Sequence, residues 1–238
     1  MIPKSVRAVF SFLVAGLSLF PVATNAQEPV TVGQQMPDIT LPAVQGGQVS
    51  LSDLRGKNVL LIFPRGRVSD HWCQICHYQY AELAHMEAEH GIRADHNLEI
   101  LFVLPYGAEA VQEWVDIFPS QMDVIEGWKN PPDPSALSEG ARNWMQTARR
   151  LFPLRFIYEN GVAPIPFPIL VDDGAVVSRQ LGLFRTEWDR SEVDQNVPTI
   201  FILDREGVVQ FKYHSQSTVD RPPYEYLMRV IERLVEDS

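Results

Sequence analysis

Two apolar runs stand out in the pattern of hydrophobic and polar positions: a continuous one at residues 59–63 and one at 98–104 in which Glu99 is the single polar residue. Runs of this length without polar alternation are typical of strands that are buried on both faces of a sheet. Pro64 and Pro105 follow them directly, and a proline cannot donate to a strand ladder. The pattern therefore predicts two central strands that end at these prolines.

A helical pattern lies between the two runs. Residues 73–90 contain neither proline nor glycine, and Gly91 follows as a helix stop. Hydrophobic positions recur at the spacing of one helical face, at Cys76, Tyr80, Leu83 and Ala84. A strand, a helix and a strand in this order imply two parallel strands joined by a right-handed crossover.

The C-terminal part of the chain predicts a β-hairpin and a final helix. Residues 197–203 and 208–213 have the composition of strands, and the turn at 204–207 joins them. A short edge strand is expected at 167–171. Two prolines at 222–223 open the last helix, whose core face holds Leu227, Val230, Ile231 and Leu234.

The stretch at residues 106–166 is interpreted as a helical insertion. An amphipathic helix is predicted at 108–118, with Val111, Trp114, Val115 and Phe118 on one face. A second helix is predicted at 135–152, with Ser135 as its cap and Leu137, Ala141, Trp144, Met145 and Ala148 facing inward. We interpret the aromatic stripes as core; a lid over the cysteines is the alternative.

Composition limits the class of protein. The chain has 238 residues, which favours one enlarged domain, and its 45% hydrophobic content is sufficient for a packed core. A formal net charge of −10 argues against nucleic acids and anionic membrane surfaces as partners.

The first 26 residues resemble a secretory signal peptide. Lys4 and Arg7 precede an apolar run at 8–19, and small residues lead to Ala26, after which we expect cleavage. The run is too short to span a bilayer comfortably, so a membrane anchor is the weaker interpretation. We therefore expect a periplasmic or secreted mature chain, 27–238, with no membrane span.

Both cysteines of the chain, Cys73 and Cys76, lie where the first central strand gives way to a helix. A disulfide that closes so small a loop adds little stability, which favours a chemical role for the pair. The positive end of the helix dipole favours a thiolate. We therefore predict that Cys73 is the exposed attacking thiol and that Cys76 resolves the resulting mixed disulfide or sulfenic acid.

The order of these elements, with Val197-Pro198-Thr199 far downstream, resembles the thioredoxin superfamily. Three further segments resemble its alkyl hydroperoxide reductase and thiol-specific antioxidant (peroxiredoxin-like) branch: residues 33–39, 51–57 and 201–207. Phe63-Pro64-Arg65-Gly66 and Trp72-Cys73-Gln74-Ile75-Cys76 are similar to the Arg-Gly-x-Trp-Cys-Pro-x-Cys form of that branch. The resemblance implies a thioredoxin-like α/β fold, in which helices flank a central mixed β-sheet.

The resemblance also implies roles for several residues. Pro198 matches the family's cis-proline beside the cysteines, Trp72 is typical next to the first cysteine, and Thr199 belongs to the same substrate-side segment. The guanidinium groups of Arg65, Arg67 and Arg221 are candidates to hold an anionic oxygen species or to stabilise the thiolate. An imidazolium at His71 or His77, which flank the pair, would act in the same direction.

The sequence departs from the peroxiredoxin pattern around the cysteines. Four additional residues separate Gly66 from Trp72, and Gln74 replaces the usual Pro or Gly. Ser69, four residues before Cys73, is the sole hydroxyl candidate for the peroxide pocket. These departures favour thiol–disulfide exchange slightly over peroxide reduction as the activity.

Two binding functions remain as alternatives. Cys73-Gln74-Ile75-Cys76-His77 matches the Cys-x-x-Cys-His pattern of c-type haem attachment. The two thiolates with a histidine could instead bind copper. The predicted enzyme, a thiol-dependent oxidoreductase, needs no cofactor or metal; its partners would be protein thiols and disulfides or small peroxides, with an unidentified reductant.

Overall fold

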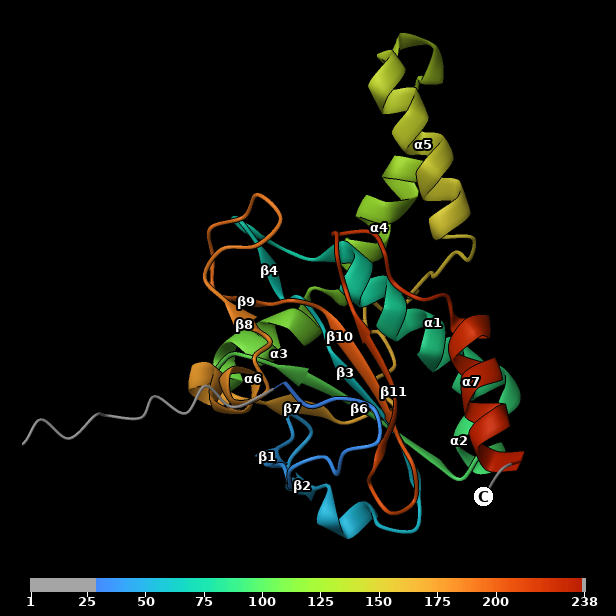
Figure 1. Ribbon diagram of the computed structural model, residues 1–238. Helices are drawn as coiled ribbons and strands as arrows, with labels where there is room; N and C mark the ends of the chain where they lie inside the picture. The colour runs from blue at the N-terminus through green and yellow to red at the C-terminus, as the bar shows by residue number, and fades with distance from the viewer. Residues whose placement is uncertain (1–28, 237–238) are drawn as a thin grey trace, which may run out of the picture.

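The computed structural model describes residues 29–236, so the predicted signal peptide lies outside the described residues. A five-stranded mixed sheet in the order β11-β10-β3-β6-β7 forms its centre (Figure 1). The strands are β3 (Asn58–Phe63), β6 (Leu98–Leu104), β7 (Ile169–Val171), β10 (Thr199–Leu203) and β11 (Val209–His214).

The strand directions confirm the topology predicted from the sequence. β3 pairs in parallel with β6, and β6 with β7, whereas β10 runs antiparallel to both β3 and β11. Helix α1 (Gln74–His90) makes the crossover from β3 to β6, and it ends at Gly91, which adopts the left-handed conformation. The sheet with its flanking helices confirms the thioredoxin-like α/β fold.

Two hydrophobic cores lie on opposite faces of the sheet, because successive residues of β3 point to opposite sides. Leu60 and Ile62 face the core that α1 and α7 (Tyr224–Glu236) cover, whereas Leu61 and Phe63 face the second core. Figure 1 shows α1 and α7 next to each other, away from α6 (Val176–Gln180).

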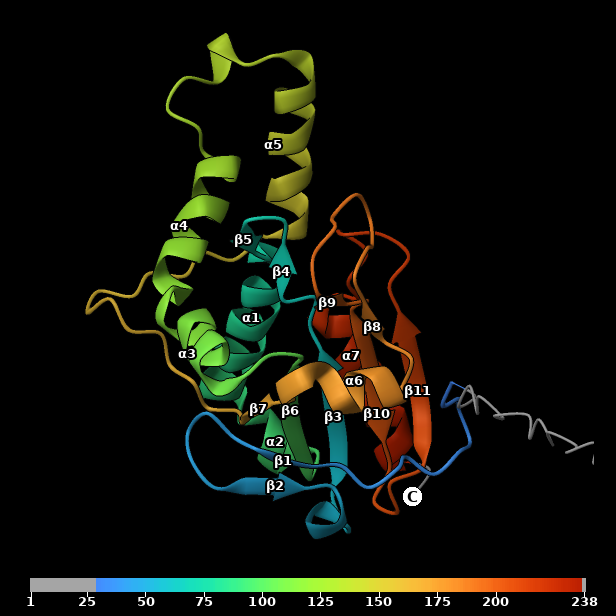
Figure 2. The same cartoon turned by 90° about the vertical axis from the view of Figure 1, so that its left-hand side faces the viewer.

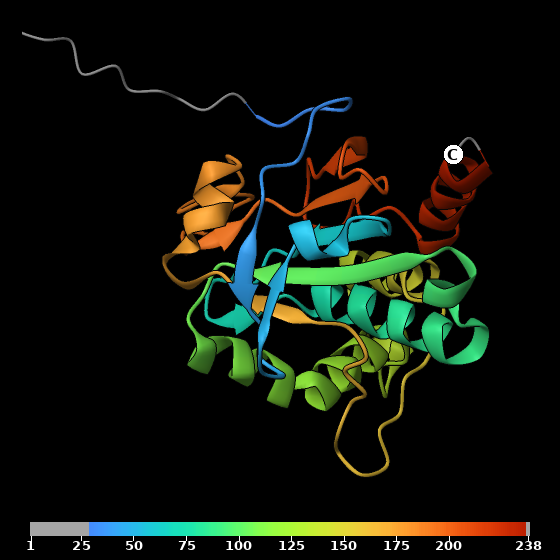
Figure 3. The ribbon, with the colours of Figure 1, turned by 90° about the horizontal axis from the view of Figure 1, so that it is seen from below.

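Small elements complete the body. β1 (Thr40–Pro42) and β2 (Gln48–Ser50) form a hairpin that crosses β6 in the view of Figure 3. The remaining short elements are β4 (Arg67–Val68), β5 (His71–Trp72), β8 (Phe184–Arg185), β9 (Gln195–Asn196), α2 (Ile92–Asp95) and single turns at Ser52–Leu54, Pro134–Ala136 and Asp173–Ala175. Within residues 29–236 no helix has the length and apolar character that a membrane span needs.

The insertion forms three helices, α3 (Ala108–Asp116), α4 (Phe118–Lys129) and α5 (Glu139–Leu151). α4 and α5 pack against each other and project from the body as an arm (Figures 1 and 2). The prediction that Ser135 caps the last of these helices is wrong. Ser138 is the cap, since its hydroxyl accepts from the Ala141 N–H, and Ser135 lies in a preceding turn that Asp133 caps.

Candidate active site

The two cysteines lie at the start of α1, which follows β3 after the short strands β4 and β5. Cys73 is the N-cap residue, with extended backbone dihedrals, and the Cys76 N–H donates to the Cys73 carbonyl over 3.1 Å. The chain enters this position from a tight hairpin, and the Cys73 N–H donates to the Gly66 carbonyl at 2.8 Å. The four additional residues noted in the sequence therefore build the β4–β5 hairpin, in which Ser69 adopts a φ of 55°.

Both sulfurs are covered, and the prediction of an exposed Cys73 is wrong. Cys73 is 2% exposed and Cys76 is fully buried, both as free thiols. The N-cap position alone would leave Cys73 near the surface. Here the Cys73 N–H bonds to the Gly66 carbonyl at the base of the β4–β5 hairpin, and Trp72 and Cys73 join the hydrophobic core.

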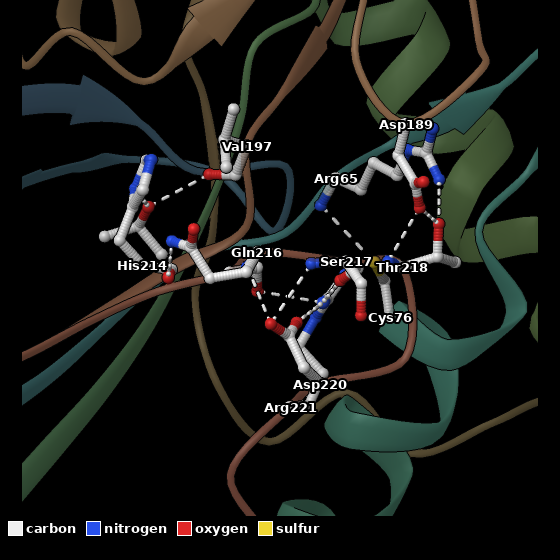
Figure 4. Close-up of polar contacts among 12 residues, drawn as sticks. Arg65, Cys76, Asp189, Val197, His214, Gln216, Ser217, Thr218, Asp220 and Arg221 are labelled. Atoms are coloured by element: carbon white, nitrogen blue, oxygen red, sulfur yellow. Dashed lines mark hydrogen bonds and ion pairs between the residues drawn. The ribbon is translucent and has the colours of Figure 1, made fainter.

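The thiolate of the pair is stabilised at Cys76. Its sulfur accepts a hydrogen bond from the Arg65 backbone N–H at 3.3 Å (Figure 4). Burial would raise the pKa of Cys76, but the Cys73 thiol, the Arg221 guanidinium and backbone N–H groups outweigh it and lower that pKa to about 6. Burial and the neighbouring sulfur raise the pKa of Cys73 well above its ordinary value. The pair thus holds one thiolate and one proton near neutral pH.

The absorbance of reduced protein at 240 nm, where thiolates absorb, is expected to report this asymmetry. One thiolate should appear with a midpoint near pH 6, because the pKa of Cys76 is depressed. The second should not appear until well above pH 9, because the pKa of Cys73 is raised. Replacing Arg221 with Gln should move the first midpoint upward, since it removes a nearby positive charge. Two equal midpoints near pH 9 would contradict the shared proton.

Arg221 is a predicted site residue whose positive charge lowers the pKa of the cysteine thiols. Its guanidinium favours the thiolate at both cysteines. Nη1 donates to the Ser215 hydroxyl at 2.9 Å and lies 3.4 Å from the Asp220 carboxylate and from the Ser217 carbonyl. Nε and Nη2 are buried and have no hydrogen-bond partner among the described residues. Arg221 can therefore still take an acceptor on that edge.

Arg65 takes a different place from the one proposed for a substrate ligand. Its side chain is 1% exposed, and each guanidinium nitrogen already donates: Nε to Gln195, Nη1 to Thr218 and Nη2 to the Trp188 carbonyl. Figure 4 shows this side chain directed toward Thr218 and Asp189, whereas its backbone N–H faces Cys76. Arg65 therefore links three segments that are distant in the sequence, at Trp188, Gln195 and Thr218, and its side chain has no free donor for a substrate.

The Val197-Pro198-Thr199 segment leads into β10. Every peptide bond among residues 29–236 is trans, so the expectation of a cis bond at Pro198 is wrong. The segment already continues the extended chain of the sheet, because the Pro198 carbonyl accepts from the Ser215 N–H. The Thr199 hydroxyl is buried and contacts the Val197 carbonyl and His214 Nδ1, both within 2.9 Å.

Trp72 is buried between the β4–β5 hairpin and α3. Its Nε1 donates to Glu113 at 2.9 Å, and the Arg67 guanidinium stacks over its ring at 4.1 Å. Arg67 also forms an ion pair with Glu113 at 2.8 Å, so its positive charge is balanced by that carboxylate and not by a cysteine thiolate. These contacts fix the β4–β5 hairpin, which leads directly into Cys73.

The two flanking histidines do not supply a cation to the thiolate. His71 is exposed and lies 3.1 Å from the Asp70 carboxylate. Burial lowers the pKa of His77 to about 4, so its imidazole is neutral at pH 7. Its Nδ1 and Nε2 lie 3.1 and 2.9 Å from the carbonyls of Cys73 and Trp114.

Neither haem nor copper fits this arrangement. A haem thioether-linked to both cysteines needs room around both sulfurs, and an axial histidine needs a ring nitrogen that faces the iron. Here both sulfurs are buried, and both nitrogens of His77 face backbone carbonyls. Among the described residues no group of three or more His, Cys, Asp or Glu side chains is arranged to hold a metal.

A cavity of about 360 Å³ lies beside the dithiol, along α1. α1, the C-terminal end of α5 and the segment before α7 line it. Neither cysteine is among the lining residues, but Ile75 is next to Cys76 in the chain and the Arg221 charge acts on both cysteines, so these two residues mark the end of the cavity nearest the dithiol. The sequence analysis missed its polar residues, Gln79, Glu82 and Glu225, because polar positions on a helix ordinarily indicate a solvated face.

Tyr106, which contacts the β4–β5 hairpin, was missed too. Its hydroxyl accepts from the Arg67 N–H at 2.9 Å and donates to the Asp194 carbonyl at 2.7 Å.

Comparisons with known proteins agree with this description. Residues 32–125, which include both cysteines, match the model of the AhpC/TSA family. The match confirms the redoxin resemblance of the sequence and, with it, the expected class of enzyme, a thiol-dependent oxidoreductase. The search of curated proteins yields no match.

Solved structures share the fold at low sequence identity. A mutant of peroxiredoxin 6 from Arenicola marina is 13% identical with a TM-score of 0.53, over 86% of this chain and 73% of that one. AhpC from Mycobacterium bovis is 16% identical with a TM-score of 0.53, over 88% and 95%. A reduced 2-Cys peroxiredoxin from Plasmodium vivax is 17% identical with a TM-score of 0.51, over 86% and 81%. At these identities the likeness concerns the fold alone.

Proposed function

We propose that this chain, whose residues 32–125 match the AhpC/TSA family, is an exported thiol–disulfide oxidoreductase that uses Cys73 and Cys76 as a reversible dithiol. The observation that carries the proposal is the pair of buried free cysteines at the start of α1, with the Cys76 sulfur accepting a hydrogen bond from the Arg65 N–H. Export rests on the composition of the first 26 residues.

The reaction follows from the sulfur pair. Cys73, at the helix N-cap and the less buried of the two residues, is the sulfur that a substrate reaches first, and transfer of its proton to Cys76 makes it the attacking thiolate. Its attack on a substrate disulfide forms a mixed disulfide and releases one substrate thiolate, which takes up a proton. Cys76 then attacks Cys73, the second substrate sulfur leaves, and the Cys73–Cys76 disulfide forms. Two electrons pass from the dithiol to the substrate.

Peroxide reduction at Cys73 is the competing proposal, and the structure offers it less support. In the described part of the chain, no hydrogen bond joins Ser69 to either sulfur; the Ser69 N–H donates to the Ser191 hydroxyl instead. Arg65 is also fully engaged with Gln195, Thr218 and Trp188. A peroxide near Cys73 would meet few free donors besides Arg221.

The two proposals differ in which substrate the reduced protein consumes faster. Mixed in stopped flow with a cystine peptide or with hydrogen peroxide, it should react with the peptide at least about tenfold faster, because exchange needs no peroxide pocket. Tryptophan fluorescence reports oxidation, and Cys73→Ser is the control. Fast sulfenic acid formation at Cys73 with dilute peroxide would contradict exchange as the main activity.

Export is tested on protein taken from the exported fraction, where mass spectrometry should show Gln27 as its first residue.

A further inference from the structure

The cavity along α1 has unsatisfied hydrogen-bond donors among its lining residues. Arg221 lines it, and its side chain is 7% exposed, with Nε and Nη2 both unpartnered. Gln79 lines it too, is 6% exposed, and has an unpartnered Nε2. Buried donors without partners are costly, so their occurrence in one cavity indicates a ligand that carries acceptors.

The unpartnered edge of the Arg221 guanidinium indicates which acceptor group the ligand carries. Nε and Nη2 form a planar pair of donors on one side of the guanidinium, while Nη1 is held by Ser215, Ser217 and Asp220. Two parallel N–H groups match the two oxygens of a carboxylate. Figure 4 shows Arg221 beside Asp220 and close to the segment that carries Cys76.

The other end of the cavity has the opposite charge. Glu82 of α1 and Glu225 of α7 line it, and neither forms an ion pair with a cation of the described residues. Burial, together with the charge of Glu225, raises the pKa of Glu82 to about 7. An ammonium group between the two carboxylates would offset both effects. Arg150, which is exposed at the C-terminal end of α5, also lines the cavity.

The spacing of the two ends sets the size of the ligand. Ile75 and Glu82 are seven residues apart on α1, which corresponds to about 10 Å along the helix axis. Three extended residues span about the same length. Tyr78, Phe152 and Pro222 provide apolar walls between the ends, and the volume suits a small molecule.

We propose that this cavity binds a short zwitterionic peptide thiol of about tripeptide length, with its carboxylate on Arg221 and its ammonium group between Glu82 and Glu225. The inference rests on the proposed function, because the bound thiol is the reductant of the oxidised dithiol. Its thiolate attacks Cys73, the Cys73–Cys76 bond breaks, and Cys76 leaves as a thiolate that is later protonated. A second peptide thiol attacks the mixed disulfide, which releases Cys73 and forms the peptide disulfide. Two peptide thiols thus supply two electrons and two protons.

Binding is tested apart from reactivity with S-methylglutathione, a zwitterionic tripeptide that cannot exchange disulfides. Calorimetry on the reduced mature chain should detect it, and acetylation of its amino group should weaken binding about tenfold, as expected for a partly buried charged contact. In Glu82→Gln the difference between the free and acetylated ligands should shrink to about threefold, because one of the two carboxylates around the ammonium group is gone. Glu89→Gln, an exposed position on the same helix, should keep the tenfold difference.

Two results would overturn the inference: no binding of S-methylglutathione, or equal binding of the free and acetylated forms to the unsubstituted chain. Circular dichroism of Glu82→Gln is expected to match that of the unsubstituted chain, since the lost carboxylate has no ion-pair partner. Exchange with a cystine peptide is measured on the same preparations. If exchange persists while the tripeptide fails to bind, the proposed function stands and the cavity assignment falls.

Discussion

Serine in place of Cys73 is expected to abolish thiol–disulfide exchange, with a loss on the order of 10³-fold or more, because the attacking sulfur is gone. The remaining Cys76 is fully buried, and its thiolate is already stabilised by the Arg65 N–H. A substrate disulfide cannot reach a sulfur that is fully buried, so Cys76 alone is a poor substitute. The initial rate with a cystine peptide measures the loss.

Serine in place of Cys76 is expected to have a different outcome. Attack by Cys73 can still occur, but no neighbouring sulfur releases the substrate, so a mixed disulfide should accumulate at Cys73. Intact mass spectrometry should show the added half of the peptide, and a small thiol should remove it. The matched comparison is Cys73→Ser, which should show little adduct. If Cys73→Ser instead accumulates the adduct, the order of the two sulfurs is the reverse of the one proposed.

The main strands and the dithiol helix could be predicted from the sequence because their signals are local. The apolar run at 59–63 lies in β3, the run at 98–104 coincides with β6, and Gly91 ends α1 as expected. Continuous burial on both faces and a helix stop each leave a mark on neighbouring residues. The position of the cysteines between β3 and α1 followed from these elements.

The environment of the sulfurs could not be predicted, because distant segments create it. Helix position alone indicated a low pKa at Cys73, yet that residue is buried in the core, and the Arg65 N–H faces Cys76 instead. The Arg65 side chain donates hydrogen bonds to Gln195 and Thr218, which are more than a hundred residues away in the chain. No periodicity in the sequence reports such pairings, and the same holds for the cavity between α1, α5 and α7.

The insertion is part of the fold at one end and projects from the body at the other. The aromatic stripe predicted at 108–118 was interpreted as core, and burial of Trp114 in α3 and of Phe118 at the start of α4 confirms it. The Trp114 ring stacks on His77 in the first turn of the dithiol helix, with centroids 4.2 Å apart and planes at 22°. In contrast, Trp144 of α5 pairs with Trp128 of α4 in the arm. The two tryptophans therefore allow the two ends to be tested separately.

Alanine in place of Trp114 is expected to destabilise the protein by about 3–5 kcal/mol, because it empties a fully buried site. His77 loses its stacking partner, so the first turn of α1 should shift and exchange should slow even where the protein stays folded. Urea unfolding measures the stability, and Trp114→Phe, which keeps a ring and removes an unpartnered indole N–H, should cost much less. Trp144→Ala should leave the thiolate titration unchanged. If it alters that titration as strongly as Trp114→Ala, the arm acts on the dithiol after all, as a lid would.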